Sequence, residues 1–413
     1  MQMKRLMMML ALVAALTACS SDDGDDGPQT INRTVLVYMA AENRLSDYAY
    51  SDLWQMKEGS RRIGNSDALL VYVDRSETTE LPWLARIRNG QLTDSVSLKD
   101  MGISTKNEYA SDPDIMRQVL RYAFDRYPAQ QDYGLVLWGH SDGWLIEADS
   151  IASRRAYGVD NGQNSKISDI GKWLNVPSLE RVLATIPHLK FIMADCCNFM
   201  CLESLYELRK VTDYIIGSTS EIPGCGAPYD TVVPALFSTA DDFYRTVVDN
   251  YFAQQVYSYE LNKELTQPLS VVKTSQMEAL AAATRTVLRS IDQSLGGDYA
   301  NLSGLIHYYN YYKPSFRPEY NIFYDAGDYV KRYASDAEYQ TWLQALNQAV
   351  VYRKYTNMWT TDKPWGSHYS DFQMSEDRYH GVSMFIPQDP TKGYYAGYNE
   401  NIKKLAWYAA VGH

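Results

Sequence analysis

The stretch at residues 189–209, LKFIMADCCNFMCLESLYELR, strongly limits the folds open to this chain. Its short apolar run, FIMA, predicts a buried strand that stops at Asp195. Apolar residues at roughly helical spacing then alternate with charged ones, which predicts an amphipathic helix. The strand thus ends in an acid and two thiols, Cys196 and Cys197. In open α/β sheets, ligands bind at this carboxyl edge of the strands.

Strands and helices alternate along the preceding chain. Near-continuous apolar runs predict buried parallel strands at 35–39, 68–73, 134–138 and 214–217. Further segments predict helices at 47–58, from Asp112 onward and at 168–183, and a more exposed hairpin at 83–87 and 95–98. This alternation predicts an α/β fold with a mostly parallel sheet that has helices on both faces.

The chain of 413 residues is too long for one ordinary domain and suits one large α/β unit with an accessory part. We predict a core at 31–265. From 266 the pattern changes, and helical segments dominate. We therefore predict a mainly helical C-terminal subdomain at 266–413, which returns a strand at about 382–386 to the core.

The first residues have the pattern of an export signal. Lys4 and Arg5 precede an apolar stretch at 6–16 that is too short to serve as a stable membrane anchor. The sequence LTAC, ending at Cys19, resembles a bacterial lipobox, which implies that residues 1–18 are removed and that Cys19 is acylated. The alternative is an ordinary signal peptide followed by an unrelated cysteine.

Residues 19–30 form the predicted tether between the lipid and the fold. Their segment SSDDGDDG has four aspartates and no apolar side chain, so we expect it to be solvated. Acidic tethers of this kind resemble the surface-export signals of some Gram-negative lipoproteins. We therefore expect the protein to be lipid-anchored to the bacterial outer membrane at the cell surface, with membrane contact through the lipid anchor only.

Composition excludes several other classes. The net charge of −11 argues against nucleic acid as a partner. Of five cysteines, three lie within six residues, which is no disulfide framework for a chain of this size. The sequence has no CxxC pair and its histidines are scattered, so we expect no zinc or other metal site.

A histidine and a cysteine follow two of the predicted strands. His140 comes after 134–138, and Cys197 comes after the FIMA strand, so both side chains leave the same edge of the sheet. A thiol near an imidazole suits nucleophilic catalysis. We expect Cys197 to precede its helix directly, where the helix field lowers the thiol pKa. The alternative is that these cysteines are small apolar packing residues.

Five segments match, in order, the motifs of one peptidase family. They are 38–45 (YMAAENRL), 137–144 (LWGHSDGW), 195–203 (DCCNFMCLE), 220–229 (SEIPGCGAPY) and 381–387 (GVSMFIP). The chain thereby resembles the clostripain family of cysteine peptidases, which share the caspase-like fold. The resemblance covers nearly the whole chain after the tether, and it implies a cysteine endopeptidase that acts on proteins or peptides.

The resemblance assigns roles at the catalytic edge. It implies that His140 is the catalytic histidine and Cys197 the nucleophile, while Cys196 stands where the family has alanine and stays open as an alternative nucleophile. The backbone N–H groups of Ser141 and Cys197 would bind the oxyanion. Ser141 replaces a family glycine, and residues 198–199 replace Leu-Met. A catalytically impaired surface lipoprotein that binds peptides or glycans is therefore the alternative function.

The resemblance also implies a preference for basic residues. Asp195, two residues before the nucleophile, would hold an Arg or Lys side chain of the substrate. The alternative is that Asp195 caps the following helix. Arg154 and Arg155 lie in the polar segment 147–164, where the resemblance implies self-cleavage and the alternative is a passive surface loop. We expect no cofactor; the resemblance leaves calcium open, but no EF-hand loop supports it.

Overall fold

A central sheet dominates the computed structural model, which describes residues 30–76, 81–146, 157–162, 171–254, 257–258, 263–264, 267–308, 322–360, 371–392 and 395–412. Its strands are β1 (Ile31–Ala41), β2 (Ala68–Arg75), β3 (Trp83–Arg88), β4 (Gln91–Ser97), β5 (Ala129–Trp138), β8 (Leu189–Asp195), β9 (Thr212–Ser218), β12 (Leu269–Lys273) and β14 (Val350–Lys354). Across the sheet their order is β14-β12-β9-β8-β5-β1-β2-β3-β4.

Five neighbouring strands in the middle of this sheet, β9, β8, β5, β1 and β2, are parallel. Antiparallel strands complete both sides: β3 and β4 beyond β2, and β12 and β14 beyond β9. The predicted hairpin is thus the β3–β4 edge of the same sheet. The predicted mostly parallel sheet is confirmed.

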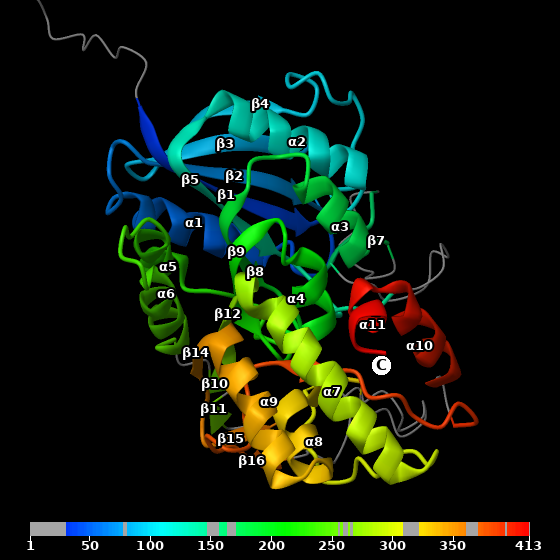
Figure 1. The fold of residues 1–413 in the computed structure, drawn as a ribbon. Helices are drawn as coiled ribbons and strands as arrows, with labels where there is room; N and C mark the ends of the chain where they lie inside the picture. Colours follow the sequence, from blue (N-terminus) through cyan, green and yellow to red (C-terminus); the bar gives the residue numbers. More distant parts are fainter. Residues whose placement is uncertain are drawn as a thin grey trace, which may run out of the picture. The chain divides into compact units, whose positions relative to one another are not determined.

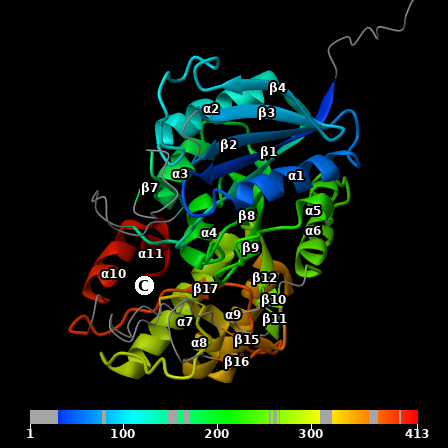
Figure 2. The same cartoon turned by 180° about the vertical axis from the view of Figure 1, so that it is seen from behind.

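Helices cover both faces (Figures 1 and 2). They are α1 (Tyr48–Ser60), α2 (Pro113–Arg126), α3 (Val176–Leu183), α4 (Leu202–Leu208), α5 (Tyr229–Leu236), α6 (Phe243–Phe252), α7 (Met277–Leu295), α8 (Ala326–Tyr333), α9 (Asp336–Ala349), α10 (Tyr395–Asn401) and α11 (Ala406–Val411), with short 3-10 helices at Thr274–Gln276 and Ile402–Lys404. Val35 and Val37 of β1 pack into one core with α1, α5 and α6, whereas Leu36 and Tyr38 pack into the other with α2, α3 and α4. Successive side chains of a strand point to opposite faces of the sheet, so one strand contributes to both cores.

The start of α2 follows its sequence signal. Asp112 is the N-cap, and its side chain accepts hydrogen bonds from the backbone N–H groups of Asp114 (2.8 Å) and Ile115 (3.4 Å). Pro113 occupies the first turn, where its missing N–H costs nothing. The predicted helix at 168–183 is placed too early in the chain. Lys172–Leu174 is a strand, β7, and α3 begins only at Val176.

Four two-stranded pairs complete the described structure. They are β6 (Tyr157–Asp160) with β7, β10 (Tyr257–Ser258) with β11 (Lys263–Glu264), β13 (Tyr324–Asp325) with β17 (Ser383–Met384), and β15 (Met358–Thr360) with β16 (Asp371–Gln373). We expected 382–386 to return to the core as a strand. Ser383–Met384 does form a strand, but it pairs with β13 and not with the central sheet.

The C-terminal part is tied to the rest of the fold at two levels. Strands β12 and β14, both beyond residue 265, belong to the central sheet, and Ile31–His413 forms one compact unit. Near β17, the N–H of Ser383 donates to the carbonyl of Met200 at 3.0 Å, and the N–H of Phe385 donates to Glu203 Oε1 at 2.7 Å. These bonds fix the 383–385 segment beside α4.

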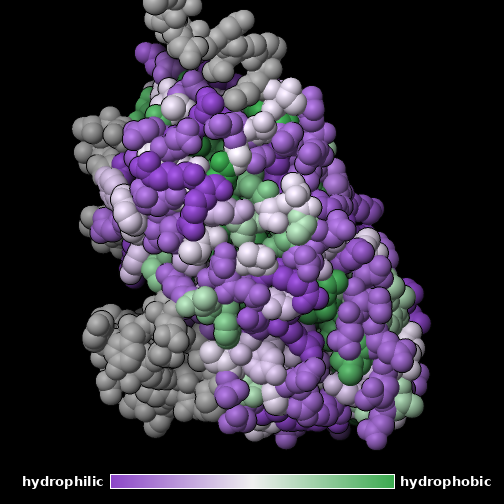
Figure 3. Space-filling model, turned by 90° about the vertical axis from the view of Figure 1, so that its left-hand side faces the viewer, coloured by the Kyte–Doolittle hydropathy of each residue, from purple (hydrophilic) through white to green (hydrophobic). Residues whose placement is uncertain are grey.

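Polar side chains predominate on the face drawn in Figure 3, where hydrophobic residues form small, separate patches. Within the described ranges, no helix combines the length and the apolar character that a membrane crossing needs.

Candidate active site

Two neighbouring strands carry the histidine and the cysteines to the same edge of the sheet. In the parallel β5–β8 ladder, Trp138 is the partner of Asp195, and the N–H of Gly139 donates to the Asp195 carbonyl at 3.4 Å. His140 and Cys197 each follow two residues after this pair. Parallel pairing therefore brings together two residues that lie far apart in the sequence.

The loop that bears His140 is held by β6 and β7. The His140 carbonyl accepts a hydrogen bond from the N–H of Gly158 at 2.8 Å, and Ser141 forms a β-bridge with Tyr157. The half-buried imidazole lies 6.5 Å from the Trp173 ring, centroid to centroid. Gly139 turns the chain out of β5 with a φ of +144°, a value that favours glycine.

Cys197 lies against the segment that follows β9. Its Sγ accepts a hydrogen bond from the N–H of Ile222 at 3.4 Å, and the side chain is half-buried. Burial raises the pKa of the Cys197 thiol, and the carboxylate of Glu221 adds to the effect, while the Ile222 N–H opposes it. The resting thiol is therefore protonated near neutral pH, so attack on a carbonyl requires a base beside it.

Cys196 and Cys201 have different environments from Cys197. Both are fully buried. Burial raises the pKa of the Cys196 thiol well above its usual value, and the Ser141 hydroxyl lies within hydrogen-bonding reach of it. Cys201 donates to Ser204 Oγ at 3.1 Å. Of these three cysteines, Cys197 is the one that is not fully buried.

The expectation that Cys197 directly precedes its helix is wrong. Helix α4 begins at Leu202, and Cys201 is its N-cap. The intervening backbone is bonded elsewhere: Asn198 N–H donates to Ser220 O at 2.9 Å, and Met200 N–H donates to Ser218 O at 3.0 Å. Asn198 has a φ of +54°, a left-handed turn that a helix cannot contain.

Ser141 is compatible with the predicted oxyanion role. Among the described non-glycine residues, positive φ occurs at Asn89, Asp94 and Asn198, and Ser141 is not one of them. Serine at this position therefore carries no backbone strain relative to the glycine of the motif. Its hydroxyl accepts a hydrogen bond from the Gly143 N–H at 3.1 Å, which helps to fix the turn after His140.

Asp195 and Asp52 are two neighbouring buried acids close to Cys197, and we call this pair the acidic floor. Asp195 Oδ2 accepts from the Tyr229 hydroxyl (2.7 Å) and the Ala227 N–H (3.1 Å), and its Oδ1 accepts from the Tyr251 hydroxyl (2.6 Å). Burial raises the pKa of Asp195, and these three donors oppose the rise. None of the donors belongs to α4, so the alternative that Asp195 caps this helix is wrong.

Asp52 is a second acid of this floor, and the sequence analysis missed it. It is fully buried, and its Oδ2 accepts from Trp138 Nε1 at 2.7 Å. Burial, followed by the nearby carboxylate of Asp195, raises the pKa of Asp52 to about 8. The available signal was its position between Ala49 and Met56 on the buried stripe of α1, where a charged residue is unusual.

Cys225 borders the same floor. Its thiol is half-buried, and its pKa is raised by burial and then by the carboxylates of Asp52 and Asp195. The predicted sites at Cys19, Arg154 and Arg155 lie outside the described residues.

Solved structures of cysteine proteases share this fold. One is a secreted C11 cysteine protease from Bacteroides thetaiotaomicron in complex with an irreversible peptide inhibitor: TM-score 0.73, 29% identity, covering 92% of this chain and 98% of that one. Another is an inactive zymogen C11 protease from Parabacteroides distasonis: TM-score 0.70, 29% identity, covering 93% and 99%. The fold and these likenesses define the chain as a cysteine peptidase with a caspase-like sheet.

The family follows from the sequence model. The model of the clostripain family matches residues 37–412, and the chain therefore belongs to that family. A comparison with curated protein sequences gives no match.

Proposed function

We propose that this protein is an endopeptidase that cleaves after Arg or Lys, with Cys197 as nucleophile and His140 as general base and acid. One observation supports the assignment: Trp138 and Asp195 are partners in the parallel β5–β8 ladder, and His140 and Cys197 each lie two residues beyond this pair. The protein or peptide substrate would bind at this edge, above the acidic floor.

The proposed reaction follows from the protonated resting thiol. His140 takes the proton from Cys197 as the sulfur attacks the carbonyl carbon of the scissile bond. The backbone N–H groups of Ser141 and Cys197 bind the oxyanion that forms. His140 returns the proton to the leaving amine as the C–N bond breaks. It then deprotonates a water molecule that hydrolyses the thioester, and the thiol is restored.

Charge around Cys197 supports a basic substrate residue. Asp195 and Asp52 form the acidic floor, and the carboxylates of Glu221 and Asp142 also raise the pKa of the Cys197 thiol. A guanidinium or ammonium group entering here would meet carboxylates from several elements, and it would favour their ionised forms. An acidic side chain would add a further negative charge to a desolvated acidic site, which is costly.

Self-processing is the second part of the proposal. Arg154 and Arg155 precede β6, the strand that holds the His140 loop, so a basic-specific enzyme would find its preferred sequence next to its own site. The similar Parabacteroides distasonis protein is described as an inactive zymogen. We propose that cleavage at this pair activates the present chain.

Location is the third part of the proposal. The lipobox-like sequence ending at Cys19 and the acidic segment after it support acylation and anchoring at the outer membrane surface. The alternative is a peptide- or glycan-binding module that stacks its ligand on the many aromatic residues of the C-terminal half. Among the described residues of that half, Trp342, Trp407 and Tyr329 are fully buried and do not serve stacking, whereas Tyr299 is exposed.

The experiment is a matched set of fluorogenic peptides that differ only in the residue before the scissile bond: Arg, Lys, Gln or Asp. We expect cleavage of the Arg and Lys peptides and refusal of the Asp peptide. Cleavage only after Asp would overturn the pocket assignment. An Arg-containing thiol-reactive probe should label the wild type but not Cys197→Ala. No labelling of the wild type would favour a catalytically impaired binding module.

A further inference from the structure

Three of the four large hydrophobic side chains that are exposed in the described part of the chain lie on one helix. They are Tyr48 (43% exposed), Tyr50 (49%) and Trp54 (63%) of α1, and the fourth is Tyr299 (50%), which follows α7. Tyr50 and Trp54 are four residues apart, so they stand on the same side of the helix. Single exposed aromatic residues are normal, whereas a group of them on one element marks an interaction site.

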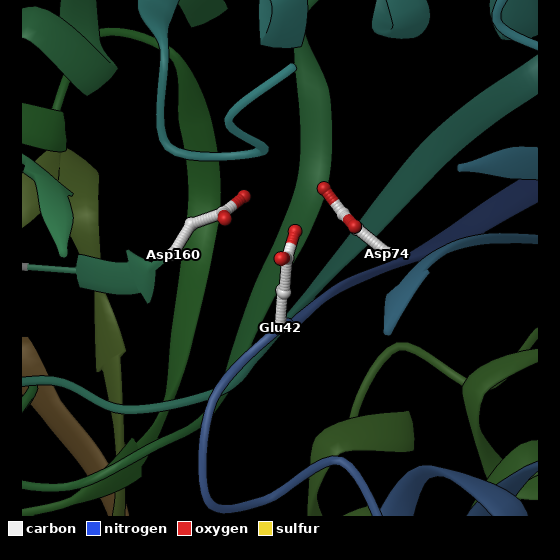
Figure 4. A group of neighbouring side chains, drawn as sticks. All are labelled: Glu42, Asp74 and Asp160. Atoms are coloured by element: carbon white, nitrogen blue, oxygen red, sulfur yellow. The ribbon is translucent and has the colours of Figure 1, made fainter. Parts of the chain in front are cut away.

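The start of α1 lies at the carboxyl edge of the central sheet. Figure 4 shows the buried carboxylates of Glu42, Asp74 and Asp160 beside one another at this edge, where β1 and β2 end. The chain leads from Glu42 into α1. Arg75 directly follows Asp74, and its guanidinium carbon lies 3.7 Å from the centroid of the Tyr50 ring. This cation–π contact holds Tyr50 at the edge that also carries the catalytic residues.

The same helix borders the pocket proposed for the basic side chain of the substrate. The Tyr48 ring packs against Gly224, where an added Cβ atom would stand 2.9 Å from Tyr48 Cε2. Gly224 immediately precedes Cys225, which borders the acidic floor. Asp52, one of the two acids of that floor, lies on the buried side of α1. One helix therefore presents an acid to the pocket and aromatic side chains to the solvent beside it.

We propose that Tyr48, Tyr50 and Trp54, which we call the aromatic surface, bind apolar side chains of the polypeptide substrate a few residues from the scissile bond. The proposal rests on the proposed function and adds a second contact region to it. Tyr48 and Trp54 are about 9 Å apart along the helix axis. An extended chain covers about 3.3 Å per residue, so about three substrate residues span the surface. The contact of Tyr48 with the rim of the pocket makes the substrate its occupant.

The chemistry of the aromatic surface differs from that of the pocket. Tyrosine and tryptophan rings offer a large apolar area at a low cost in side-chain entropy, and they dominate the binding energy of many protein interfaces. The acidic floor would select one basic residue of the substrate, and the aromatic surface would select apolar residues near it. Such apolar residues are mostly buried in folded proteins, so the enzyme would act preferentially on unfolded segments.

The test compares two peptides that have the same central arginine. The flanking residues are Leu and Phe in one peptide and Ser and Gln in the other. With the wild type, kcat/KM should be about tenfold higher for the apolar peptide, mainly through a lower KM. Tyr50→Gln/Trp54→Gln should reduce this ratio to about twofold or less, and any general damage cancels in the ratio. Tyr299→Gln, at a tyrosine of similar exposure, should leave the ratio unchanged.

Equal cleavage of the two peptides by the wild type would overturn the proposal and leave the basic preference intact. An undiminished ratio in the double variant would overturn it as well. Sedimentation in which the wild type dimerises and the double variant does not would assign the surface to a second copy of the chain, against the proposal.

A second measurement does not depend on cleavage after arginine. If no Arg peptide is cut, the basic preference fails, but crosslinking still tests the aromatic surface. A benzophenone amino acid in place of Trp54 should capture the apolar peptide on illumination, and one in place of Tyr299 should not. Equal capture at both positions, or capture at neither, would reject the surface.

Discussion

Trp138 and Asp195 are partners in the parallel ladder between β5 and β8, and this single pair organises the whole candidate site. Two residues beyond it lie His140 and Cys197. On the face of the sheet that α1 covers, Trp138 Nε1 donates a hydrogen bond to Asp52 Oδ2. The pair thus connects the reactive edge of the sheet to its buried acidic floor.

The first prediction separates the two adjacent cysteines. Cys197→Ala should lower kcat/KM by about 10³-fold or more, because the covalent step is lost. Cys196→Ala should keep most of the activity, since this thiol is fully buried. Kinetics with an Arg peptide, together with circular dichroism to verify folding, would measure both. Equal losses in two folded variants would show that the assignment of Cys197 is wrong.

The second prediction concerns Asp195. Asp195→Asn should reduce kcat/KM for an Arg peptide by about 10- to 100-fold, the value of a charge-assisted hydrogen bond. A matched Gln peptide should be affected much less, so the ratio of the two substrates isolates the charge from any general damage. A proportional loss with both peptides would mean that Asp195 supports the fold and does not select the substrate.

The third prediction is a dependence of stability on pH that arises from Asp52. Its pKa is raised to about 8 in the folded protein, whereas an unfolded aspartate titrates near about 3.9. Between these values the folded state holds a proton that the unfolded state has released. The stabilisation is therefore complete below about pH 4 and is lost as the pH rises to about 8.

Asp52→Asn removes this titration but keeps an acceptor for Trp138. We expect its free energy of unfolding, measured in urea in the Cys197→Ala background, to vary less between pH 5 and 8 than that of the parent. Parallel curves for parent and variant would contradict the raised pKa of Asp52.

The fourth prediction is self-cleavage beside the active site. The purified wild type should convert to two associated fragments with a new N-terminus at Arg155 or Ala156. Cys197→Ala should stay intact, and so should the double variant Arg154→Gln/Arg155→Gln with an unaltered nucleophile. N-terminal sequencing and mass spectrometry measure the outcome. A single uncut chain with full activity would show that processing is not required.

The fifth prediction concerns the membrane. A palmitate analogue supplied to growing cells should label the wild type but not Cys19→Ala, which should become soluble. External protease should also reach the wild type on intact cells. If it does not, the surface assignment fails, although lipidation at Cys19 would still stand. Equal labelling of both forms would place the lipid at another residue.

The sequence indicated the strands and the reactive residues because their signals are local. The apolar runs before His140 and Cys197 each end where a polar side chain begins, and the structure confirms both strands. The signal that decides where α4 begins is not local in the sequence. Residues 198–200 form hydrogen bonds with 218–220, a contact that sequence periodicity does not contain, so the helix starts later than expected.

The chain by itself determined the sheet class, the strand ends that bear His140 and Cys197, and the order of the family motifs. Only the tertiary structure decided which of the three clustered thiols is not fully buried, which donors surround Asp195, and that Asp52 joins its floor. It also brought Glu42, Asp74 and Asp160 together. The physical reason is that burial and electrostatic coupling depend on distances between segments, whereas hydrophobic periodicity reports only how one segment faces its own core.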